Sequence, residues 1–281
     1  MIKELLTQAK VRLRQSNLNE VDAEILLSNQ LGIARMDLHN PIKLEAALAN
    51  LDVENLSELF NTDIARRISG EPVQYITGCA YFRDLELAVG PGVLIPRPET
   101  EALVSYVLSQ IEDLNHEISL IDLGSGSGAI AIALAIENNR IRAIAVEKSE
   151  AALYWLKENV AKYQPDMRVI YGDIATALEG IKCDVVVANP PYVPDGIQLP
   201  ADVINHEPHD SLFGGPTGLE IPTNFIKAAV RLLKPGGLFV MEHAEEHGEG
   251  VKNLLEGEFE SIQLHYDLNK RPRFTSARRK R

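Results

Sequence analysis

A strand, a glycine-rich loop and a helix follow one another near the middle of this chain, and this arrangement leaves few folds open to it. Ser119–Leu123 predicts a strand, Gly124–Gly128 alternates glycine with serine, and the apolar run Ala129–Ile136 predicts a helix. This order is typical of nucleotide-binding α/β folds, in which glycines let a ligand approach the backbone. Because NAD-dependent enzymes share such a loop, the loop alone leaves the identity of the ligand open.

Acidic side chains mark the ends of three predicted strands and narrow the choice of ligand. They are Asp122, Glu147 after Ile141–Val146, and Asp173 after Met167–Tyr171. An acid at the position of Glu147 can accept hydrogen bonds from both ribose hydroxyls, and the loop lacks the Lys-Ser/Thr pair that holds phosphates. The pattern favours a cofactor that carries positive charge and no phosphate. We therefore predict S-adenosylmethionine, a sulfonium with a free amino group.

A further apolar run, Asp184–Ala188, predicts a buried strand that ends in Asn189-Pro190-Pro191-Tyr192. Proline has no N–H, so the backbone after Asn189 offers carbonyl acceptors and no donors. The Asn189 side chain adds an acceptor oxygen, and Tyr192 adds a flat aromatic face. Such a site suits a planar –NH2 group whose nitrogen attacks an electrophile supplied from elsewhere, here by the cofactor at the glycine loop.

Composition and charge describe an ordinary globular protein of 281 residues, with 45% hydrophobic and 24% charged residues. No apolar run approaches the roughly 20 residues of a membrane span, and the N-terminus lacks the layout of a signal peptide. Cys79 and Cys183 lie in unrelated segments, which argues against a disulfide framework. We therefore expect a cytoplasmic protein that does not bind a membrane.

The net charge of −12 is unevenly spread along the chain, because the last twelve residues, Lys270–Arg281, carry seven basic groups and no acid. The acidic remainder is a poor match for a nucleic-acid duplex, whose phosphates dominate affinity, and it suits a basic protein partner. The basic segment could touch RNA or an acidic surface. The favoured interpretation is a solvated, frayed terminus.

The chain divides by its patterns into a helical part and an alternating part. Residues 1–68 show helical periodicity, with Asn19 as an expected N-cap and with helices expected over Val21–Leu27, Leu44–Leu51 and Leu56–Ile68. Val73–Val89 predicts a hairpin that pairs Gln74–Ile76 with Phe82–Val89. From Thr100 onward strands and helices alternate, which indicates a mostly parallel sheet covered on both faces. Ser261–Leu268 and Arg273–Ala277 predict a final pair of strands.

Taken together, these motifs resemble the protein-(glutamine-N5) methyltransferases that modify peptide chain release factors. Asn-Pro-Pro-Tyr alone also fits adenine and guanine amino-methyltransferases, and the narrower segments decide the resemblance. The deciding segments are Gly70–Ile76 and Ile95–Glu101 taken together. The match also includes Arg66-Arg67, Gly70–Gly78, Phe82, Leu94–Glu101, Glu207-Pro208, Gly214-Gly215, Gly218-Leu219 and Glu242-His243. The chain departs from the family in Ser125, Ser127 and Glu147, which preserve the chemistry, and in Phe213 and Thr217, which leave the role of residues 213–217 open.

The resemblance implies a Rossmann-like, seven-stranded S-adenosylmethionine-dependent methyltransferase domain over residues 96–281. It also implies a helical domain over residues 1–70 that docks the release factor, and a β-hairpin linker over residues 71–95. The substrate would be the glutamine of the Gly-Gly-Gln loop of class 1 release factors. We expect a monomer that does not act on DNA.

Each predicted site residue has an expected role. Asn189 Oδ1 and the Pro190 carbonyl would accept the two amide hydrogens of the glutamine, Tyr192 would stack on the amide plane, and these residues with Pro191 would form the substrate site. The cofactor would be held by Asn189 and by residues of the glycine loop and the neighbouring strand ends. These are Gly124, Ser125, Gly126, Ser127, Gly128, Glu147, Asp173 and Ile174.

Alternatives remain for several of these residues. Asp173 is a favoured helix N-cap residue, Glu147 could be an ordinary surface acid, and Arg97 with Glu99 could form only a structural ion pair. His243 and His247 are spaced like metal ligands, but the sequence between them is not that of a zinc-binding helix, and no metal is predicted. The rival functions are an amino-methyltransferase that acts on nucleic acid and a non-catalytic protein that binds release factors.

Overall fold

The described residues of the computed structural model, 2–49, 51–267 and 269–281, form two compact units. The first contains the residues up to Cys79 together with 200–206, and the second contains 80–199 and 207–281. Met1 and Asn50, within the predicted helical part, and Leu268, the expected end of a strand, lie outside the described residues. The domain limits expected at residues 70 and 95 stay predictions.

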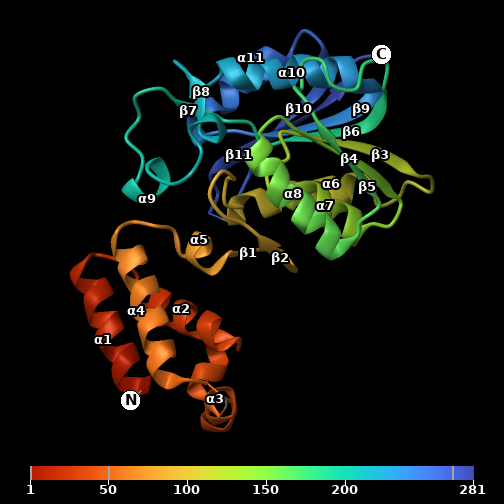
Figure 1. Cartoon of the computed structure of the whole chain (residues 1–281). Coiled ribbons are helices and arrows are strands. Elements are labelled where there is room, and N and C mark those ends of the chain that lie inside the picture. Colours follow the sequence, from red (N-terminus) through yellow and green to blue (C-terminus); the bar gives the residue numbers. More distant parts are fainter. Residues whose placement is uncertain (1, 50, 268) are drawn as a thin grey trace. The chain divides into compact units, whose positions relative to one another are not determined.

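The first unit is a helical bundle, as its sequence predicts (Figure 1). Its helices are α1 (Ile2–Gln15), α2 (Val21–Leu31), the 3-10 turn η1 (Arg35–His39), α3 (Pro41–Leu48), α4 (Val53–Ile68), the short α5 (Val73–Thr77) and α9 (Ala201–Ile204). Leu13, Leu27 and Phe60 are fully buried in a shared apolar core. The N-cap position of α2 is held by Glu20, which makes no side-chain capping bond, so the expected N-cap at Asn19 is wrong by one residue. Asn19 Oδ1 nevertheless accepts a hydrogen bond from Val21 N at 3.0 Å.

The predicted hairpin is shifted along the sequence. The expected strand Gln74–Ile76 is wrong, because Val73–Thr77 forms the helical turn α5. Gly78 closes that turn with φ at 72° while its N–H donates to Gln74 O, a geometry that glycine adopts without strain. The hairpin instead pairs β1 (Cys79–Phe82) with β2 (Leu85–Ala88). The aromatic and β-branched residues of α5 favour a strand by propensity, and the following glycine overrides them.

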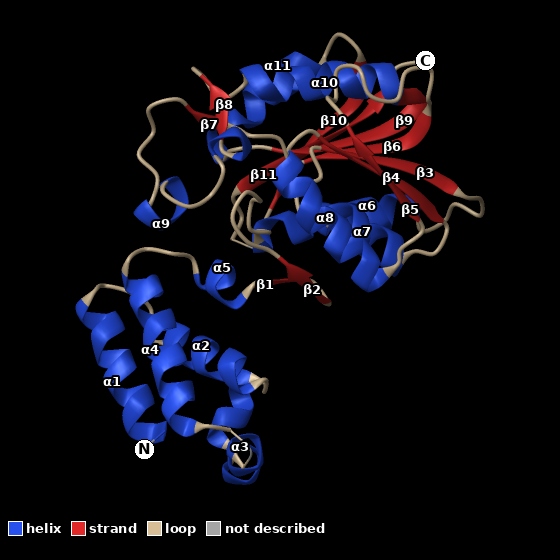
Figure 2. Cartoon of the chain, viewed as in Figure 1, coloured by secondary structure: helices blue, strands red, loops and turns tan. Residues whose placement is uncertain are grey.

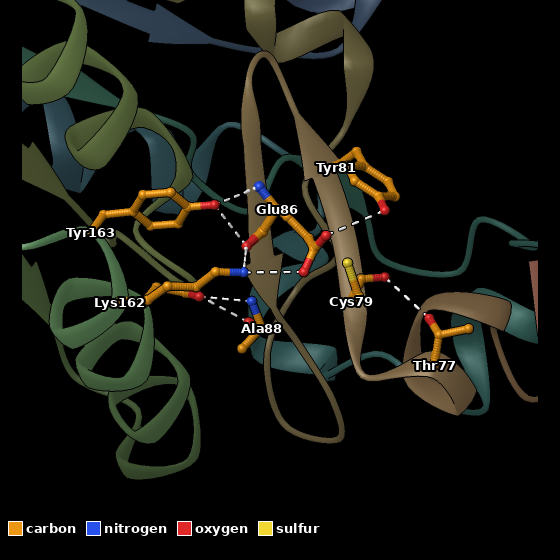
Figure 3. Close-up of polar contacts among 8 residues, drawn as sticks. Thr77, Cys79, Tyr81, Glu86, Ala88, Lys162 and Tyr163 are labelled. Carbon is orange, nitrogen blue, oxygen red and sulfur yellow. Dashed lines mark hydrogen bonds and ion pairs between the residues drawn. The ribbon is translucent and has the colours of Figure 1, made fainter. Parts of the chain in front are cut away.

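Strand β2 is fastened to helix α8 (Glu150–Tyr163) of the second unit. Figure 3 shows Tyr163 and Lys162 reaching Glu86 from the same side. Tyr163 Oη accepts from Glu86 N at 2.7 Å and donates to Glu86 O at 2.9 Å, while Lys162 Nζ pairs with Glu86 Oε1 at 3.1 Å. The buried Asn159 hydrogen-bonds both backbone groups of Ala88 and also donates to Ser127 O at 3.0 Å. The hairpin and the glycine loop therefore share one buried anchor.

A mixed sheet forms the centre of the second unit (Figure 2). Among the described residues it has seven strands in the order β10-β11-β9-β6-β3-β4-β5, which confirms the predicted α/β fold. The strands β3 to β6 and β9 run parallel, and β11 is antiparallel to both of its neighbours. The strand bounds are β3 (Ile118–Leu123), β4 (Ile141–Glu147), β5 (Met167–Tyr171), β6 (Cys183–Ala188), β9 (Leu233–Glu242), β10 (Phe259–Tyr266) and β11 (Pro272–Arg279).

Helices cover both faces of this sheet. Helices α6 (Glu101–Ile111), α7 (Ala129–Glu137) and α8 lie on one face, and α10 (Glu220–Leu232) and α11 (Gly248–Leu255) lie on the other (Figure 1). Successive residues of a strand point to opposite faces. Val185 and Val187 of β6 accordingly pack against α6 and α7, while Val186 and Ala188 pack against α10 and α11. Within the described residues, no helix has both the length and the apolar content that a membrane span requires.

The parallel strands end in register, and this brings the predicted site residues to one edge. Leu123 is paired with both Val146 and Ala188, and Ala188 is paired with Met241. The next residues along these strands are Gly124, Glu147, Asn189 and Glu242. Four strand ends therefore meet at the carboxyl edge of the sheet, where ligands bind in folds of this class.

The basic C-terminal segment is part of the sheet. The favoured interpretation of a frayed terminus is wrong, because β11 lies between β10 and β9 and buries Thr275, Ser276 and Ala277. Its basic groups contact nearby acceptors: Arg273 pairs with Asp267 at 3.1 Å, and Arg279 pairs with Glu258 at 2.8 Å. The strand predicted over Arg273–Ala277 is confirmed and extends over Pro272–Arg279, with the buried run Phe274–Ala277 flanked by arginines.

Deletion of residues 272–281 is expected to abolish the cooperative thermal unfolding transition of the methyltransferase unit, because β9 and β10 lose the strand that joins them. Circular dichroism with temperature measures this transition. Deletion of Arg281 alone, which follows β11, is the control and should leave the transition in place. A 272–281 deletion that unfolds like the full chain would contradict the placement of β11.

Candidate active site

A cavity of about 1050 Å³ opens at the carboxyl edge of the sheet. Its wall combines the glycine loop, the ends of β4 and β6, the segment before α6, the loop 208–213 and one side of α10. Of the predicted site residues, those that line it are Gly124, Ser125, Gly126, Ser127, Glu147, Asp173, Ile174, Asn189 and Pro191. Gly128, Pro190 and Tyr192 lie outside this lining. The structure therefore brings most of the predicted residues around one space.

The glycines of the loop have different roles. At Gly126 an added Cβ would lie 3.9 Å from Val93, so the space beside this backbone is open to a ligand. At Gly128 an added Cβ would come within 2.6 Å of Leu156 and 2.9 Å of Ile132. The glycine at 128 is thus required for close packing between α7 and α8, and its predicted contact with the cofactor stays untested.

Glu147 is buried at the end of β4 and is part of the site's framework. Its Oε2 accepts a hydrogen bond from Gly126 N at 2.9 Å, and its Oε1 accepts from Ser149 N at 2.7 Å. The alternative of an ordinary surface acid does not fit this burial. Each carboxylate oxygen has a second lone pair, so Glu147 can still accept from ribose hydroxyls while it fixes the loop.

Asp173 is exposed and lines the same cavity beyond β5. Its Oδ1 accepts from Ala175 N at 2.8 Å, and its carbonyl accepts from Ala177 N at 2.7 Å. The expected capping geometry is therefore present, although the segment that follows is a series of turns. Arg231 of α10 donates to Ile174 O at 2.7 Å and holds this wall in place.

Asp122 is a buried acid of the cavity wall that the sequence marked only as a strand end. It is 1% exposed, and neither carboxyl oxygen has a hydrogen-bond partner among the described residues. Burial raises the pKa of Asp122 to about 7. The Ser125 hydroxyl and the Ala131 amide oppose this pKa shift, but the Ser125 hydroxyl donates its hydrogen bond to the Asp122 backbone carbonyl at 3.0 Å. A buried acceptor without a donor is costly unless a ligand supplies one.

The wall fits S-adenosylmethionine in its chemistry. The unpartnered Asp122 carboxyl offers an acceptor for an ammonium group, the open backbone at Gly126 accommodates a close approach, and Glu147 offers acceptors for ribose hydroxyls. The adenine would lie by Ile174. In the described part of the chain, no three His, Cys, Asp or Glu side chains gather so that they could hold a metal ion.

The Asn189 carboxamide lines the cavity at the end of β6 and is held at one end. Its Nδ2 donates to Thr100 Oγ1 at 3.4 Å, near the upper limit of a hydrogen bond. Thr100, in the 3-10 turn η2 (Pro98–Thr100), donates in turn to Glu242 Oε2 at 2.6 Å. Because Nδ2 is engaged, Oδ1 is the end of the amide that remains to accept a donor.

Tyr192 is anchored by its hydroxyl group. Tyr192 Oη donates to Glu242 Oε1 at 3.1 Å, and burial raises the pKa of the phenol. The chain after Tyr192 pairs β7 (Val193–Pro194) with β8 (Phe213–Gly215). An added Cβ at Gly214 would lie 2.7 Å from Pro191 O, and one at Gly218 would lie 2.4 Å from Tyr192 O. The glycines of this loop therefore let it pack directly against the Asn-Pro-Pro-Tyr backbone, a role the sequence left open.

Arg97 forms an ion pair with Glu207, since its Nη2 lies 2.6 Å from Glu207 Oε1. The alternative of a structural ion pair between Arg97 and Glu99 is therefore wrong in its partner. Glu207 is buried, and its Oε2 accepts from Ile95 N at 3.0 Å. This carboxylate joins residues 95–97 to the loop 208–213, and both segments line the cavity.

Of the two histidines, His243 serves local contacts, whereas the buried Nδ1 of His247 has no hydrogen-bond partner among the described residues. His243 is fully buried, with Nε2 hydrogen-bonded to Thr275 Oγ1 at 2.9 Å and Nδ1 to Ala244 O at 2.8 Å. Burial lowers the pKa of His243. The side chain therefore links β9 to β11.

Sequence reasoning did not assign Thr100, Glu242 or Asp122 to the site. Each carried a signal: Asp122 and Glu242 are acids at the ends of apolar strands, and Thr100 lies within the Leu94–Glu101 motif. The contact between Thr100 and Glu242 could not be predicted from the sequence, because these residues are far apart in the chain. They meet only through the register of β9 beside β6.

Two family models match the chain. Residues 100–206 match the methyltransferase small domain, and residues 4–78 match the PrmC N-terminal domain. Similar curated proteins include the release factor glutamine methyltransferases of Streptomyces coelicolor and Mycolicibacterium smegmatis. They are 39% and 36% identical to this chain, and each alignment covers 92% of this chain and 90% of the relative.

Solved structures share the fold at low sequence identity. A methyltransferase from Pyrococcus furiosus gives a TM-score of 0.55 with 16% identity, and covers 79% of this chain and 100% of its own. A Thermus thermophilus 16S rRNA N2 G1207 methyltransferase, in complex with AdoMet and guanosine, gives 0.53 with 19% identity and covers 72% and 50%. These likenesses show the methyltransferase fold.

The Asp122→Asn variant is expected to show a weaker dependence of stability on pH. A folded-state pKa of about 7, against an ordinary value of 3.8, means that the folded protein binds this proton more tightly. The contribution of Asp122 protonation to the free energy of unfolding is therefore fully present below pH 3.8. It is lost as the pH rises to about 7, by up to the order of 4 kcal/mol.

Urea unfolding of the cofactor-free protein between about pH 5 and pH 8 measures this difference. Wild type should lose stability with rising pH, and Asp122→Asn should lose clearly less. Asp113→Asn, an exposed change, serves as the control and should behave as wild type. Equal slopes in wild type and Asp122→Asn would show that Asp122 does not titrate in this range.

Proposed function

Because the chain belongs to the release factor glutamine methyltransferase family, and is therefore an S-adenosylmethionine-dependent methyltransferase, we propose that it methylates the side-chain amide nitrogen of the glutamine in the Gly-Gly-Gln motif of class 1 release factors. The observation that carries this proposal is the Asn189 carboxamide. Its Nδ2 is engaged by Thr100, so its Oδ1 is left to accept from a planar –NH2 group at the cavity.

The chemical difficulty is the weak nucleophilicity of a carboxamide nitrogen, whose lone pair is delocalised into the carbonyl. Asn189 Oδ1 and the Pro190 carbonyl accept the two amide hydrogens and turn the lone pair towards the methyl group. Catalysis of this kind depends on orientation and fixed dipoles, and both terms are worth several kcal/mol when the geometry is close to that of attack. A general base is not required before transfer, since the nitrogen becomes acidic only once methylated. It would then release one proton to solvent, leaving a neutral N-methyl amide, while the cofactor would leave as the thioether S-adenosylhomocysteine.

The framework residues fix this geometry before substrate arrives. Tyr192 is expected to flank the amide plane, with its ring oriented by the hydrogen bond to Glu242. The glycine loop 214–218 packs against the same backbone. A pre-organised acceptor pair lowers the cost of reorganisation during the reaction.

The cofactor would be held by residues that already have the required chemistry. When bound, S-adenosylmethionine supplies the electrophilic methyl group. Asp122 and the backbone at Gly126 would contact its amino-acid portion, Glu147 its ribose, and Asp173 with Ile174 its adenine. Asp122 is an addition to the residues predicted from the sequence.

Partner and setting follow from the same proposal. The helical unit would dock the release factor, and the enzyme would act as a cytoplasmic monomer that leaves DNA untouched. The rival action on nucleic acid has less support, because Arg273 and Arg279 of the basic segment pair with acids of the same unit. A basic groove of the kind that nucleic-acid enzymes need is therefore not supplied by this segment.

A methyl-transfer assay tests the proposal. The full chain is incubated with S-adenosylmethionine and a purified class 1 release factor, and peptide mass spectrometry locates the added methyl group. One methyl on the glutamine of Gly-Gly-Gln is the expected result. An unmodified release factor in the presence of bound cofactor would move the substrate to nucleic acid or to another protein.

The Asn189→Ala variant is expected to lose turnover by at least about a hundredfold, because one of the two acceptors that orient the amide is removed. Binding of S-adenosylmethionine, measured by titration calorimetry, should change little. Asn253→Ala on the exposed surface of α11 is the matched control and should keep full activity. Near-normal turnover in Asn189→Ala would refute the proposed mechanism.

A further inference from the structure

Glu242 is a buried carboxylate with hydrogen-bond partners on both oxygens. It is 2% exposed at the end of β9, where Oε2 accepts from Thr100 and Oε1 accepts from Tyr192. Burial raises the pKa of Glu242, and the hydrogen bonds from Thr100 and Tyr192, together with the positive charge of Arg273 on β11, oppose that rise. A buried carboxylate is costly unless donors compensate it, so its two donors are held firmly.

Thr100 connects Glu242 to the substrate site through its hydroxyl group. A hydroxyl group has one proton to donate, and Thr100 donates it to Glu242 at 2.6 Å. What Thr100 Oγ1 presents to Asn189 is therefore a lone pair, which selects the Nδ2 end of the carboxamide. The Oδ1 end is then directed away from Thr100.

Resting on the function proposed above, we propose that Glu242 and Thr100 are positioning residues that set the orientation of the Asn189 carboxamide. Glu242 holds both ends of the Asn-Pro-Pro-Tyr segment: Asn189 through the Thr100 hydroxyl, and Tyr192 directly. Without this chain of hydrogen bonds the amide can turn by half a rotation and present donors to the substrate –NH2 group, which has only donors to offer.

Two substitutions at Thr100 separate the hydroxyl from the shape of the side chain. Thr100→Val keeps the volume and removes the hydroxyl, whereas Thr100→Ser keeps the hydroxyl. Thr275→Val is the matched control, because Thr275 is a fully buried threonine on the neighbouring β11 whose hydroxyl contacts His243 and not Asn189.

We expect Thr100→Val to lower kcat by about tenfold or more, with KM for the release factor and Kd for S-adenosylmethionine within about twofold of wild type. Thr100→Ser should restore most of kcat. Thr275→Val should keep kcat within about twofold although it also loses a buried hydrogen bond. Glu242→Gln, which places an NH2 group against one of two donors, should resemble Thr100→Val. Equal kcat losses in Thr100→Val and Thr275→Val would overturn the inference.

A second readout does not depend on the substrate. In protein labelled with nitrogen-15 asparagine, the side-chain NH2 signals of Asn189, identified by their absence in Asn189→Ala, should show slow solvent exchange in wild type and Thr100→Ser. They should exchange faster in Thr100→Val. Unchanged exchange in Thr100→Val would contradict the positioning role, whereas an inactive wild type with the expected exchange pattern would contradict only the proposed substrate.

Discussion

The in-register ends of four parallel strands are the constraint on which the rest of the site depends. Leu123, Val146, Ala188 and Met241 lie side by side, so β3, β4, β6 and β9 end within one residue of the same level. Alternation along each strand directs Asp122, Asn189 and Glu242 to the face that α6 and α7 cover. Polar groups from distant parts of the sequence thus share one space without any loop having to reach across it.

The hydrogen-bond partners of two buried carboxyl groups at this edge distinguish a residue that supports the structure from one that is suited to bind a ligand. Glu242 has a protein donor on each oxygen, and its role is therefore internal to the protein. Asp122 is equally buried and has none among the described residues, so its carboxyl group suits a donor from a ligand. The two acids have the same chemistry and the same sheet edge, and only their partners distinguish them.

The sequence was sufficient for the fold and for most of the cavity wall because those features depend on local patterns. The glycine loop, the apolar strands and Asn189–Tyr192 can each be found from a few neighbouring residues. The errors arose where local signals competed. Tyr75 and Ile76 favour a strand, but Gly78 closes a helical turn there. The charge of residues 270–281 favoured a frayed terminus, in conflict with the strand that Arg273–Ala277 predicts and β11 confirms.

The remaining features required the tertiary structure. Arg97 is next but one to Glu99, yet it pairs with Glu207, which the fold brings to its side. Glu242 is linked to Asn189 by way of Thr100, and Thr100 and Glu242 are 142 positions apart in the sequence. No spacing rule predicts a contact between them. Residues 214–218 could be understood only when their glycines were seen against the backbone of Tyr192.

The most direct test of the central claim is a crystal structure of the full chain with S-adenosylhomocysteine and a release factor. We predict that the Asn189 Oδ1 and Pro190 O atoms both lie about 3 Å from the glutamine Nε2, while Asn189 Nδ2 remains on Thr100 Oγ1. A complex in which Asn189 has turned its NH2 group towards the glutamine nitrogen, or has left Thr100, would contradict the account.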